Sequence, residues 1–443
     1  MPEQLSARPL PVWVEPSAVF AMLEARVSDV FWLDAGAEAT EGWSFVGTGE
    51  RSTLPVGTRL DAAPADDDTS LPPFRGGWVG WLDYESGAAA AGAPIAGPVG
   101  ATGGAWVRAT HVVAFDHARR QTWVQCAEGK IEAWEADILR TEAPAEGVAP
   151  PHGDVGDARV VAEARHDPQE YQALIERCRD LIRAGIAYQL CLTTRFTVAG
   201  VHDPVAVYGR LRCATPAHHG GFVRIGDRTL LSASPEQFLH AEGGVLRTRP
   251  IKGTRPRGAD PVQDAALAAE LAVDRKERAE NVMIVDLMRN DLSRVCVPGS
   301  IRVDGLWVVE SYPAVHQLVS TVSGVAAEAT TVGALLDATF PAGSMTGAPK
   351  LSAMTRLREL EGGPRGMYAG CFGYIGVDGS LDLAMVIRSI VIEPEQAVVG
   401  AGGGITWLSD AAAEVAEVAT KARAPLAALG AGMPALWGSD ILN

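Results

Sequence analysis

One helix-to-strand transition constrains the fold more than any other feature of this sequence. Asp167 is a good N-cap, Pro168 suits the first helical turn, and Glu170 lies three residues after the cap, which together predict the start of a helix. An apolar stripe follows at helical spacing, and Gly185 ends it. Residues 187–196 then alternate between two faces, which is typical of a strand.

The later sequence also mixes helices and strands. Residues 261–292 read as one long helix or two closely joined ones, and residues 371–392 read as a hairpin with an Asp-Gly turn. A final helix is predicted after a cap at Ser409 or Asp410. Because the order shows no regular βαβ alternation and no internal repeat, we expect an α+β fold rather than a doubly wound parallel sheet.

A compositional break divides the chain. Residues 141–161 are rich in Pro, Gly and Ala and carry little periodicity, as expected of a linker or a long surface loop. The segment before it consists of short strand-like runs and glycine turns. We therefore predict a strand-rich N-terminal region at 1–145, a linker at 146–160 and a second region at 161–430.

Composition excludes several classes of protein. The chain has 54 Asp and Glu against 38 Lys and Arg, a net charge of −16, and this argues against nucleic-acid binding, which needs a basic face. The six cysteines show no zinc-binding spacing and suit a reducing compartment. No signal peptide or long apolar segment is evident, so we expect a cytoplasmic protein that does not bind membranes.

Two pairs of glutamates are candidate metal ligands. Glu277 and Glu280 are three residues apart in one predicted helix, and Glu414 and Glu417 are three apart in the last one, so each pair lies on one helical face. If the two helices meet, the carboxylates repel one another unless a cation holds them, and oxygen ligands suit Mg²⁺. The alternative is two solvated helix faces.

Two glycine-containing segments are candidate anion sites. Residues 400–405, "GAGGGI", follow a strand and would let backbone N–H groups approach an anion closely. Residues 340–350, "FPAGSMTGAPK", precede a predicted helix and could hold an anion at its start. Neither segment fits the phosphate-binding P-loop pattern, and plain turns are the alternative.

Three further side chains could carry chemistry. Glu236 follows a proline at a strand end and could act as a general acid with a raised pKa, or serve only as an acid at a helix start. His316 lies in an apolar run and is either a core residue or a catalytic one. Lys252 would become a nucleophile if burial or neighbouring cations favoured loss of its proton, whereas a solvated basic loop is the alternative. The cations near it in sequence are Arg247, Arg249, Arg255 and Arg257.

The order of the motifs resembles a known family. The blocks are "YQLCLTTRF", "SASPEQFL", "RPIKGTRPR", "KERAENVMIVDLMRNDLSRV", "VHQLVSTVSG", "FPAGSMTGAPK", "GCFGYIG" and "GAGGGIT". Together they resemble, in order, the signature blocks of the chorismate-utilising enzymes over roughly residues 165–425. The resemblance implies an anthranilate synthase component I-like fold, in which two sheets pack together with helices outside and the active site lies between the sheets. Residues 161–430 would then form the chorismate-binding catalytic region.

The resemblance also implies roles for individual residues. Glu280 and Glu417 would bind Mg²⁺ directly, and Glu277 and Glu414 would form an outer pair. Lys252 would be the nucleophile and Glu236 the acid that protonates the departing C4 hydroxyl, and His316 would have a positioning role. The residues expected to bind the substrate are Gln189, Thr254, Tyr368, Arg388, Gly402, Gly404 and Lys421.

Two positions distinguish the branches of the family. Water-adding members carry a lysine base where this chain has Gln189, and a neutral amide cannot activate water as a base. Anthranilate synthases usually read "PIAGT" where this chain reads "PIKGT", with Lys252 at the centre. The pattern is thus most similar to aminodeoxychorismate synthase component I, the large subunit of para-aminobenzoate synthase.

That similarity implies a transferase-type amination of chorismate. The expected product is 4-amino-4-deoxychorismate, formed through a covalent adduct on Lys252 and used for p-aminobenzoate and folate synthesis. A separate glutamine amidotransferase subunit would supply the ammonia. The alternatives are an anthranilate synthase component I and an aminodeoxyisochorismate synthase.

Overall fold

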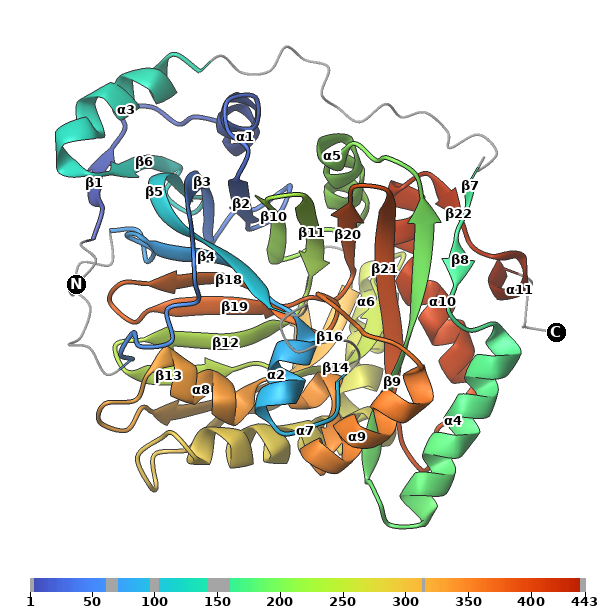
Figure 1. The fold of residues 1–443 in the computed structure, drawn as a ribbon. Coiled ribbons are helices and arrows are strands. Elements are labelled where there is room, and N and C mark those ends of the chain that lie inside the picture. The colour runs from blue at the N-terminus through green and yellow to red at the C-terminus, as the bar shows by residue number, and fades with distance from the viewer. Residues whose placement is uncertain (1–3, 61–70, 96–102, 142–159, 313–314, 439–443) are drawn as a thin grey trace.

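The chain folds into two antiparallel sheets that pack face to face between outer helices (Figure 1). The computed structural model describes residues 4–60, 71–95, 103–141, 160–312 and 315–438. The long strand β5, Gly104–Asp116, belongs to both sheets, because it pairs with β3 along most of its length and with β4 near its start. The predicted α+β sandwich is confirmed.

The first sheet runs from the N-terminal strands to the centre of the candidate site. Its order is β1-β6-β5-β3-β2-β10-β11-β20-β21-β9, and β8 and β17 also pair with β9. Besides β5, its strands are β1 (Ser6–Pro9), β2 (Val30–Asp34), β3 (Trp43–Ser52), β6 (Gln121–Cys126), β8 (Glu163–Ala164), β9 (Gln189–Ala199), β10 (His219–Ile225), β11 (Arg228–Ser234), β17 (Gly347–Ala348), β20 (Ser389–Glu393) and β21 (Gln396–Ile405).

The second sheet continues from β5 in the order β4-β18-β19-β12-β13-β16. Strand β14 pairs with β16 next to β13, and β15 pairs with the other edge of β16. Its strands are β4 (Gly77–Leu82), β12 (Gln237–Glu242), β13 (Val245–Thr248), β14 (Ile251–Pro256), β15 (Arg302–Ser311), β16 (Val315–Val325), β18 (Cys371–Gly376) and β19 (Leu381–Met385).

Helices cover the outer face of each sheet (Figure 1). The helices next to the first sheet are α1 (Pro16–Glu24), α3 (Ile131–Leu139), α4 (Pro168–Arg183), α5 (Pro204–Ala214), α9 (Lys350–Glu361) and α10 (Ala411–Ala428). Those next to the second sheet and its edges are α2 (Tyr84–Ala90), α6 (Pro261–Val273), α7 (Arg275–Ser293) and α8 (Val332–Thr339). Short elements complete the list: the 3-10 turns η1 (Glu128–Lys130) and η2 (Gly343–Met345), the paired β7 (Val160–Val161) and β22 (Ala431–Gly432), and α11 (Ala435–Gly438).

Three hydrophobic cores account for this layering. The core between the sheets is aromatic and includes Phe31, Phe45, Phe74, Trp81 and Phe372. A second core lies between the first sheet and its helices, and a third lies between the second sheet and its helices. Burial of apolar area is the main favourable term in folding, so each sheet is stabilised on both faces. No described helix is long and apolar enough to cross a membrane.

Several local predictions are confirmed. Asp167 and Glu170 form a reciprocal capping box at the start of α4, in which each side chain accepts a hydrogen bond from the other residue's backbone N–H. The hairpin predicted over residues 371–392 is confirmed for β18 and β19, and Gly379 in its turn has a φ of 85°. Residues 389–392 instead belong to β20, which pairs with β11 and β21 in the first sheet. The segment 261–292 forms two helices rather than one, because Asp274 adopts an extended conformation and caps α7.

The predicted division into regions at 1–145, 146–160 and 161–430 stays a prediction. Residues 142–159, which include almost all of the expected linker, lie outside the described residues. Strands from the two flanking regions pair with one another, since β2 pairs with β10 and β4 with β18. The two regions therefore share their sheets.

Candidate active site

The candidate site begins where β9 and β21 run side by side at the end of the first sheet. Thr193 pairs with Gly402 and Cys191 with Gly404, and Gln189 continues the same face of β9. A Cβ atom at Gly404 would lie 2.5 Å from Gln189 Nε2. Only glycine at this position therefore leaves room for the Gln189 amide.

Lys252 reaches the same point from the second sheet. The imagined Cβ of Gly404 would lie 3.0 Å from Lys252 Nζ, so β14 and β21 approach each other here. The ammonium also lies 3.9 Å from Glu280 Oε2 on α7. Burial alone would lower the pKa of Lys252, but Glu280, Cys191 and Glu236 hold this pKa above its ordinary value. Lys252, whose side chain is 15% exposed, is thus a part-buried cation among acidic groups.

The arginines near Lys252 in sequence do not surround it in space. Arg249 bonds to Glu310. The Arg257 guanidinium forms two hydrogen bonds of 2.7 Å to Asp264. Arg255 is held by carboxylates of α6 and α7 and by Asp274 between them. The expectation that neighbouring cations would favour loss of the Lys252 proton is therefore wrong, because Arg249, Arg255 and Arg257 have acidic partners of their own and the acidic groups near Lys252 raise its pKa.

Glu236 has the properties expected of a general acid. It lies just before β12 and is 7% exposed, and burial raises its pKa to about 7. The Ser344 hydroxyl of η2 donates a hydrogen bond to its carboxylate, and the charges of Lys252 and Lys421 also favour the ionised form. The sequence analysis named the segment that contains Ser344 as a candidate anion site, but it did not predict the hydrogen bond between Ser344 and Glu236.

The four predicted metal-ligating glutamates come from α7 and α10. Burial raises the pKa of Glu280 and of Glu414. Burial would also raise the pKa of Glu417, but Lys421, with its Nζ 2.5 Å from Glu417 Oε1, brings that pKa below its ordinary value. Glu277 points to Arg255, with 3.7 Å between Oε1 and Nη1.

A lysine that the sequence interpretation missed links the two helices. Lys276 Nζ lies 3.8 Å from Glu280 Oε1 and 3.7 Å from Glu414 Oε1. Within the described residues, no three His, Cys, Asp or Glu side chains lie close enough to hold a metal ion together. The donor set nevertheless fits Mg²⁺, because it consists of carboxylate oxygens and Glu280 Oε1 is buried without a hydrogen-bond partner.

Tyr368, Arg388 and Lys421 form a second cluster beside β21. The Tyr368 ring lies against Gly400, where a Cβ would be 2.1 Å from the ring. Burial lowers the pKa of Arg388, and its guanidinium interacts with Tyr368 and Glu417. Lys421 Nζ donates a 2.8 Å hydrogen bond to the Gly402 carbonyl. A desolvated guanidinium beside a phenol is suited to binding a carboxylate.

His316 and Thr254 were predicted to be site residues, but neither points to the cluster around Lys252. Both ring nitrogens of His316 are occupied, one 2.8 Å from Ser311 Oγ and the other 2.9 Å from Asp264 Oδ1, as in a satisfied core histidine. A bulge in β14 at Gly253 shifts the register, so that Lys252 pairs with Leu318 but Thr254 pairs with the next residue of β16. Thr254 is exposed and faces away from Lys252.

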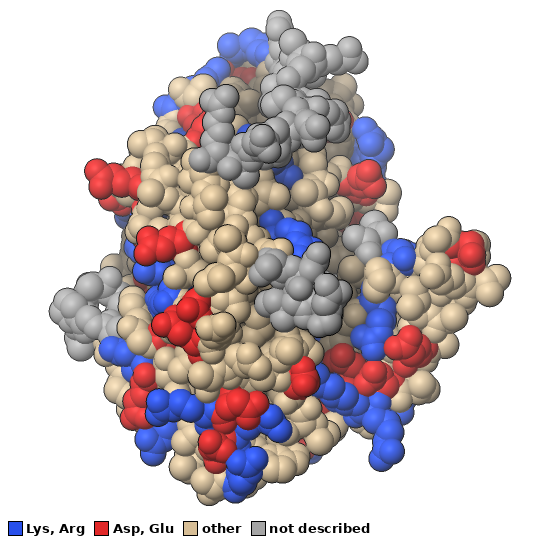
Figure 2. Space-filling view, turned by 90° about the vertical axis from the view of Figure 1, so that its right-hand side faces the viewer, with Lys and Arg blue, Asp and Glu red and all other residues tan. Residues whose placement is uncertain are grey.

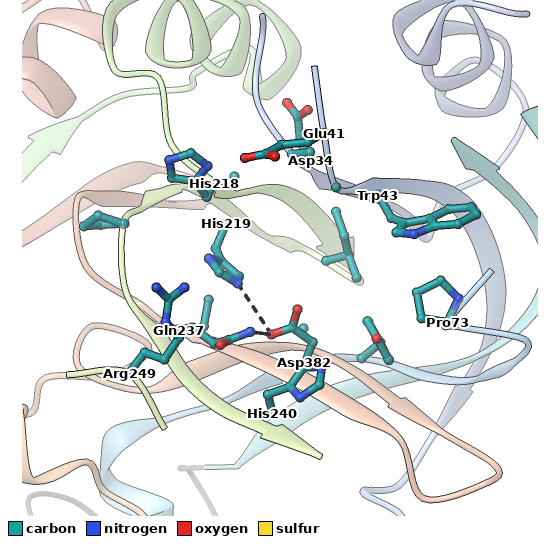
Figure 3. Close-up of a pocket in the computed structure, with 18 of the residues that line it drawn as sticks. Asp34, Glu41, Trp43, Pro73, His218, His219, Gln237, His240, Arg249 and Asp382 are labelled. Carbon is teal, nitrogen blue, oxygen red and sulfur yellow. Dashed lines mark hydrogen bonds and ion pairs between the residues drawn. The ribbon is translucent and has the colours of Figure 1, made fainter. Parts of the chain in front are cut away.

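A cavity lies elsewhere in the sandwich, away from the predicted site residues (Figure 3). Its volume is about 870 Å³, and its polar wall contains His219, Gln237, His240 and Asp382. The Asp382 carboxylate accepts a 2.9 Å hydrogen bond from Gln237 Nε2 and pairs with His219 Nε2 at 3.5 Å. None of the predicted site residues lines this cavity.

The face in Figure 2 has a mixed charge. Lys and Arg side chains lie among Asp and Glu side chains there, and no continuous basic patch is visible on this face. The cations of the candidate site are likewise matched by carboxylates, with Lys252 near Glu280 and Lys421 near Glu417.

The fold and these clusters define a class of enzyme built on a two-sheet sandwich. Residues 28–427 match the family described as chorismate binding enzymes, and this match covers most of the chain. The chain belongs to that family.

Individual relatives come from two branches. The chain is 39% identical to an aminodeoxychorismate synthase of Streptomyces pristinaespiralis over 96% of this chain and 65% of that relative. It is also 39% identical to an anthranilate synthase component 1 of Streptomyces coelicolor over 81% of this chain and 74% of that one. The chain thus spans slightly less than two thirds of the aminodeoxychorismate synthase.

A solved structure shares the fold. The anthranilate synthase component I of Streptococcus pneumoniae aligns with a TM-score of 0.71 at 28% identity, over 96% of this chain and 92% of that one.

Proposed function

We propose that this chain aminates chorismate at C4 and produces 4-amino-4-deoxychorismate. The observation that supports this most is the position of Lys252, whose amine lies next to Gly404 and the Gln189 amide, between the two sheets. A relative named aminodeoxychorismate synthase aligns over 96% of the chain. The Lys252 amine provides a nucleophile. The neutral Gln189 amide cannot act as a base that activates water, which argues against addition of water to chorismate.

Lys252 and Glu236 divide the reaction into two substitutions. The neutral Lys252 amine attacks ring C2, the ring double bond shifts, and the C4–O bond breaks as Glu236 protonates the departing hydroxyl. Ammonia then forms a bond to C4, the double bond shifts back, and the C2–Nζ bond breaks. The pKa of Glu236, about 7, lets it carry this proton at neutral pH.

Other side chains of the site would bind the anionic substrate. Arg388 and Tyr368 are placed to hold one substrate carboxylate, and the backbone of the glycine-rich β21 is open to another. Glu280 and Glu417 would hold Mg²⁺ directly, with Glu277 and Glu414 as the outer pair. When bound, Mg²⁺ would neutralise these carboxylates and anchor the ring carboxylate of the substrate.

The ammonia would come from a separate glutamine amidotransferase subunit. This proposal is based on the resemblance to the amino-transferring members of the family. We also propose a cytoplasmic location, because all six cysteines are free and five of them are buried. The product would supply p-aminobenzoate and folate synthesis.

Amination at C2, as in an anthranilate synthase, is the second candidate. The relative named anthranilate synthase component 1 is 39% identical to this chain, as similar as the aminodeoxychorismate synthase in identity though over less of the chain. Lys252 favours amination at C4, because its amine would occupy C2 while ammonia attacks.

Identification of the product separates the two functions. The purified chain is incubated with chorismate, MgCl₂ and an ammonium salt, and the product is identified by mass and by conversion to p-aminobenzoate with an added lyase. We expect 4-amino-4-deoxychorismate. Direct release of anthranilate would show that the second candidate is correct.

A further inference from the structure

Lys276 occupies an unusual position between the two acidic helices. It is the second residue of α7, and its side chain is 48% exposed. Its ammonium nevertheless lies within 4 Å of carboxylates on two different helices, Glu280 on α7 and Glu414 on α10. No motif in the sequence predicted this contact, since Glu414 is distant in the chain.

The carboxylates that Lys276 contacts are not ordinary surface groups. Glu280 is 9% exposed and Glu414 is 4% exposed. Glu280 Oε1 has no hydrogen-bond partner. The positive charge that offsets the charge on this oxygen is the Lys276 ammonium, 3.8 Å away. Two desolvated carboxylates repel one another strongly unless a cation lies between them.

We infer that Lys276 is a counter-ion which the chain supplies to this carboxylate cluster, and that a divalent cation binds there by displacing it. The inference rests on the proposed function, because it takes Glu280 and Glu414 to be near the metal. A second cation cannot share these oxygens without repelling the ammonium. Lys276 can leave because its stem is half exposed, whereas the side chain of Lys252 is only 15% exposed.

This displacement gives Lys276 two opposite effects. Without metal it stabilises the pair of helices, because it separates their negative charges. With metal it weakens binding, because its contacts with Glu280 and Glu414 must first break. Lys276 therefore tunes the affinity of the site for the cation and keeps the metal-free site folded.

Titration of MgCl₂ into the metal-free full-length chain tests the inference. Wild type is compared with Lys276→Met, which keeps an unbranched side chain one atom shorter and removes the charge. Arg356→Met is the matched control, because it also removes one cation, one that pairs with Glu359 on α9 away from the cluster. Binding is measured by calorimetry, and Tm is measured in EDTA and in saturating MgCl₂.

We expect Lys276→Met to bind Mg²⁺ about three- to tenfold more tightly than wild type, since two partly exposed ion pairs no longer oppose binding. Its Tm should be lower in EDTA, and the difference should close in saturating MgCl₂. Arg356→Met should match wild type in its Mg²⁺ affinity. An unchanged or weaker affinity in Lys276→Met would overturn the inference, as would wild-type protein that binds no Mg²⁺.

The product assay keeps the two proposals apart. Wild-type protein that makes anthranilate but shows the expected change in Mg²⁺ affinity would contradict the proposed function and leave the role of Lys276 standing. Protein that makes 4-amino-4-deoxychorismate but shows no tighter binding in Lys276→Met would contradict the role of Lys276 alone.

Discussion

Lys252 Nζ lies 3.9 Å from Glu280 Oε2, so the amine expected to attack the substrate is paired with a carboxylate expected to bind the metal. The two groups come from β14 and α7, which meet only in the folded chain. Such a pair keeps the amine protonated, because the negative charge favours the ammonium form. If Lys252 is the nucleophile, as proposed, its attack therefore requires that the charge on Glu280 be neutralised.

Replacement of Glu280 by glutamine should abolish most Mg²⁺-dependent turnover. The amide keeps one oxygen but loses the charge, so we expect kcat/KM to fall by at least about a hundredfold. Turnover is measured across a range of MgCl₂ concentrations. Asp286→Asn, on the exposed face of the same helix, is the control and should behave as wild type. Full activity in Glu280→Gln would contradict the assignment of the metal ligands.

The raised pKa of Glu236 should appear in the stability of the metal-free protein. Its pKa is raised from 4.5 to about 7, so folding takes up a proton in this window and stability falls as pH rises through it. Between pH values below 4.5 and above about 7, this pKa shift changes the free energy of unfolding by up to about 3 kcal/mol. Glu236→Gln should show a shallower decline in urea unfolding from pH 5 to 8. Parallel curves for the two proteins would mean that Glu236 titrates normally.

A methyl group at Gly404 should damage the site without unfolding the chain. The new Cβ would lie 2.5 Å from Gln189 Nε2 and 3.0 Å from Lys252 Nζ, so both side chains must move. We expect kcat to fall at least about tenfold and stability to fall by about 1–3 kcal/mol. The matched control is Gly209→Ala in α5, where nothing lies within 4 Å and a small gain in stability is expected. Normal kinetics in Gly404→Ala would show that the site is not crowded at this point.

Arg365 is a structural cation behind the site. It pairs with Glu361 at 2.6 Å and donates to the carbonyls of Met345 and Cys191, and both charged side chains are at most 3% exposed. Arg365→Met should cost about 3–5 kcal/mol in the free energy of unfolding, because it leaves a buried charge unpaired. The double variant Glu361→Gln/Arg365→Met should lose less than the single variant. Equal or larger losses in the double variant would contradict this explanation.

Local signals in the sequence predicted much of the fold. The capping box at Asp167 and Glu170 and the turn at Gly379 depend on neighbouring residues, so a short stretch of sequence was enough. The division between α6 and α7 was left open in the sequence interpretation, although Asp274, with Glu277 three residues later, has the residue types of a helix start and caps α7 in the structure. The two-sheet arrangement was expected from the order of family motifs rather than from local patterns.

The environment of Lys252 could not be predicted in the same way. Three of its neighbouring arginines, Arg249, Arg255 and Arg257, pair with acidic residues of β15, α6, α7 and the turn between these helices. These partners lie outside the stretch in which the arginines were noted. The bulge at Gly253, with a φ of 77°, also turns Thr254 away from Lys252. The contact of Lys276 with Glu414 joins two helices, α7 and α10, that are far apart in the sequence. These relationships arise from tertiary packing, and no local pattern records them.

The most direct test of the account is whether chorismate becomes attached to Lys252 on the way to product. The protein is mixed with chorismate and MgCl₂ without ammonium, quenched rapidly, and examined by intact and peptide mass spectrometry. On the peptide that contains Lys252, we expect a mass increase equal to one chorismate less one water. When ammonium is then added, this mass increase should disappear and 4-amino-4-deoxychorismate should form. Lys252→Ala should show neither. Formation of 4-amino-4-deoxychorismate by Lys252→Ala at the wild-type rate, or by wild type without any adduct, would contradict the account.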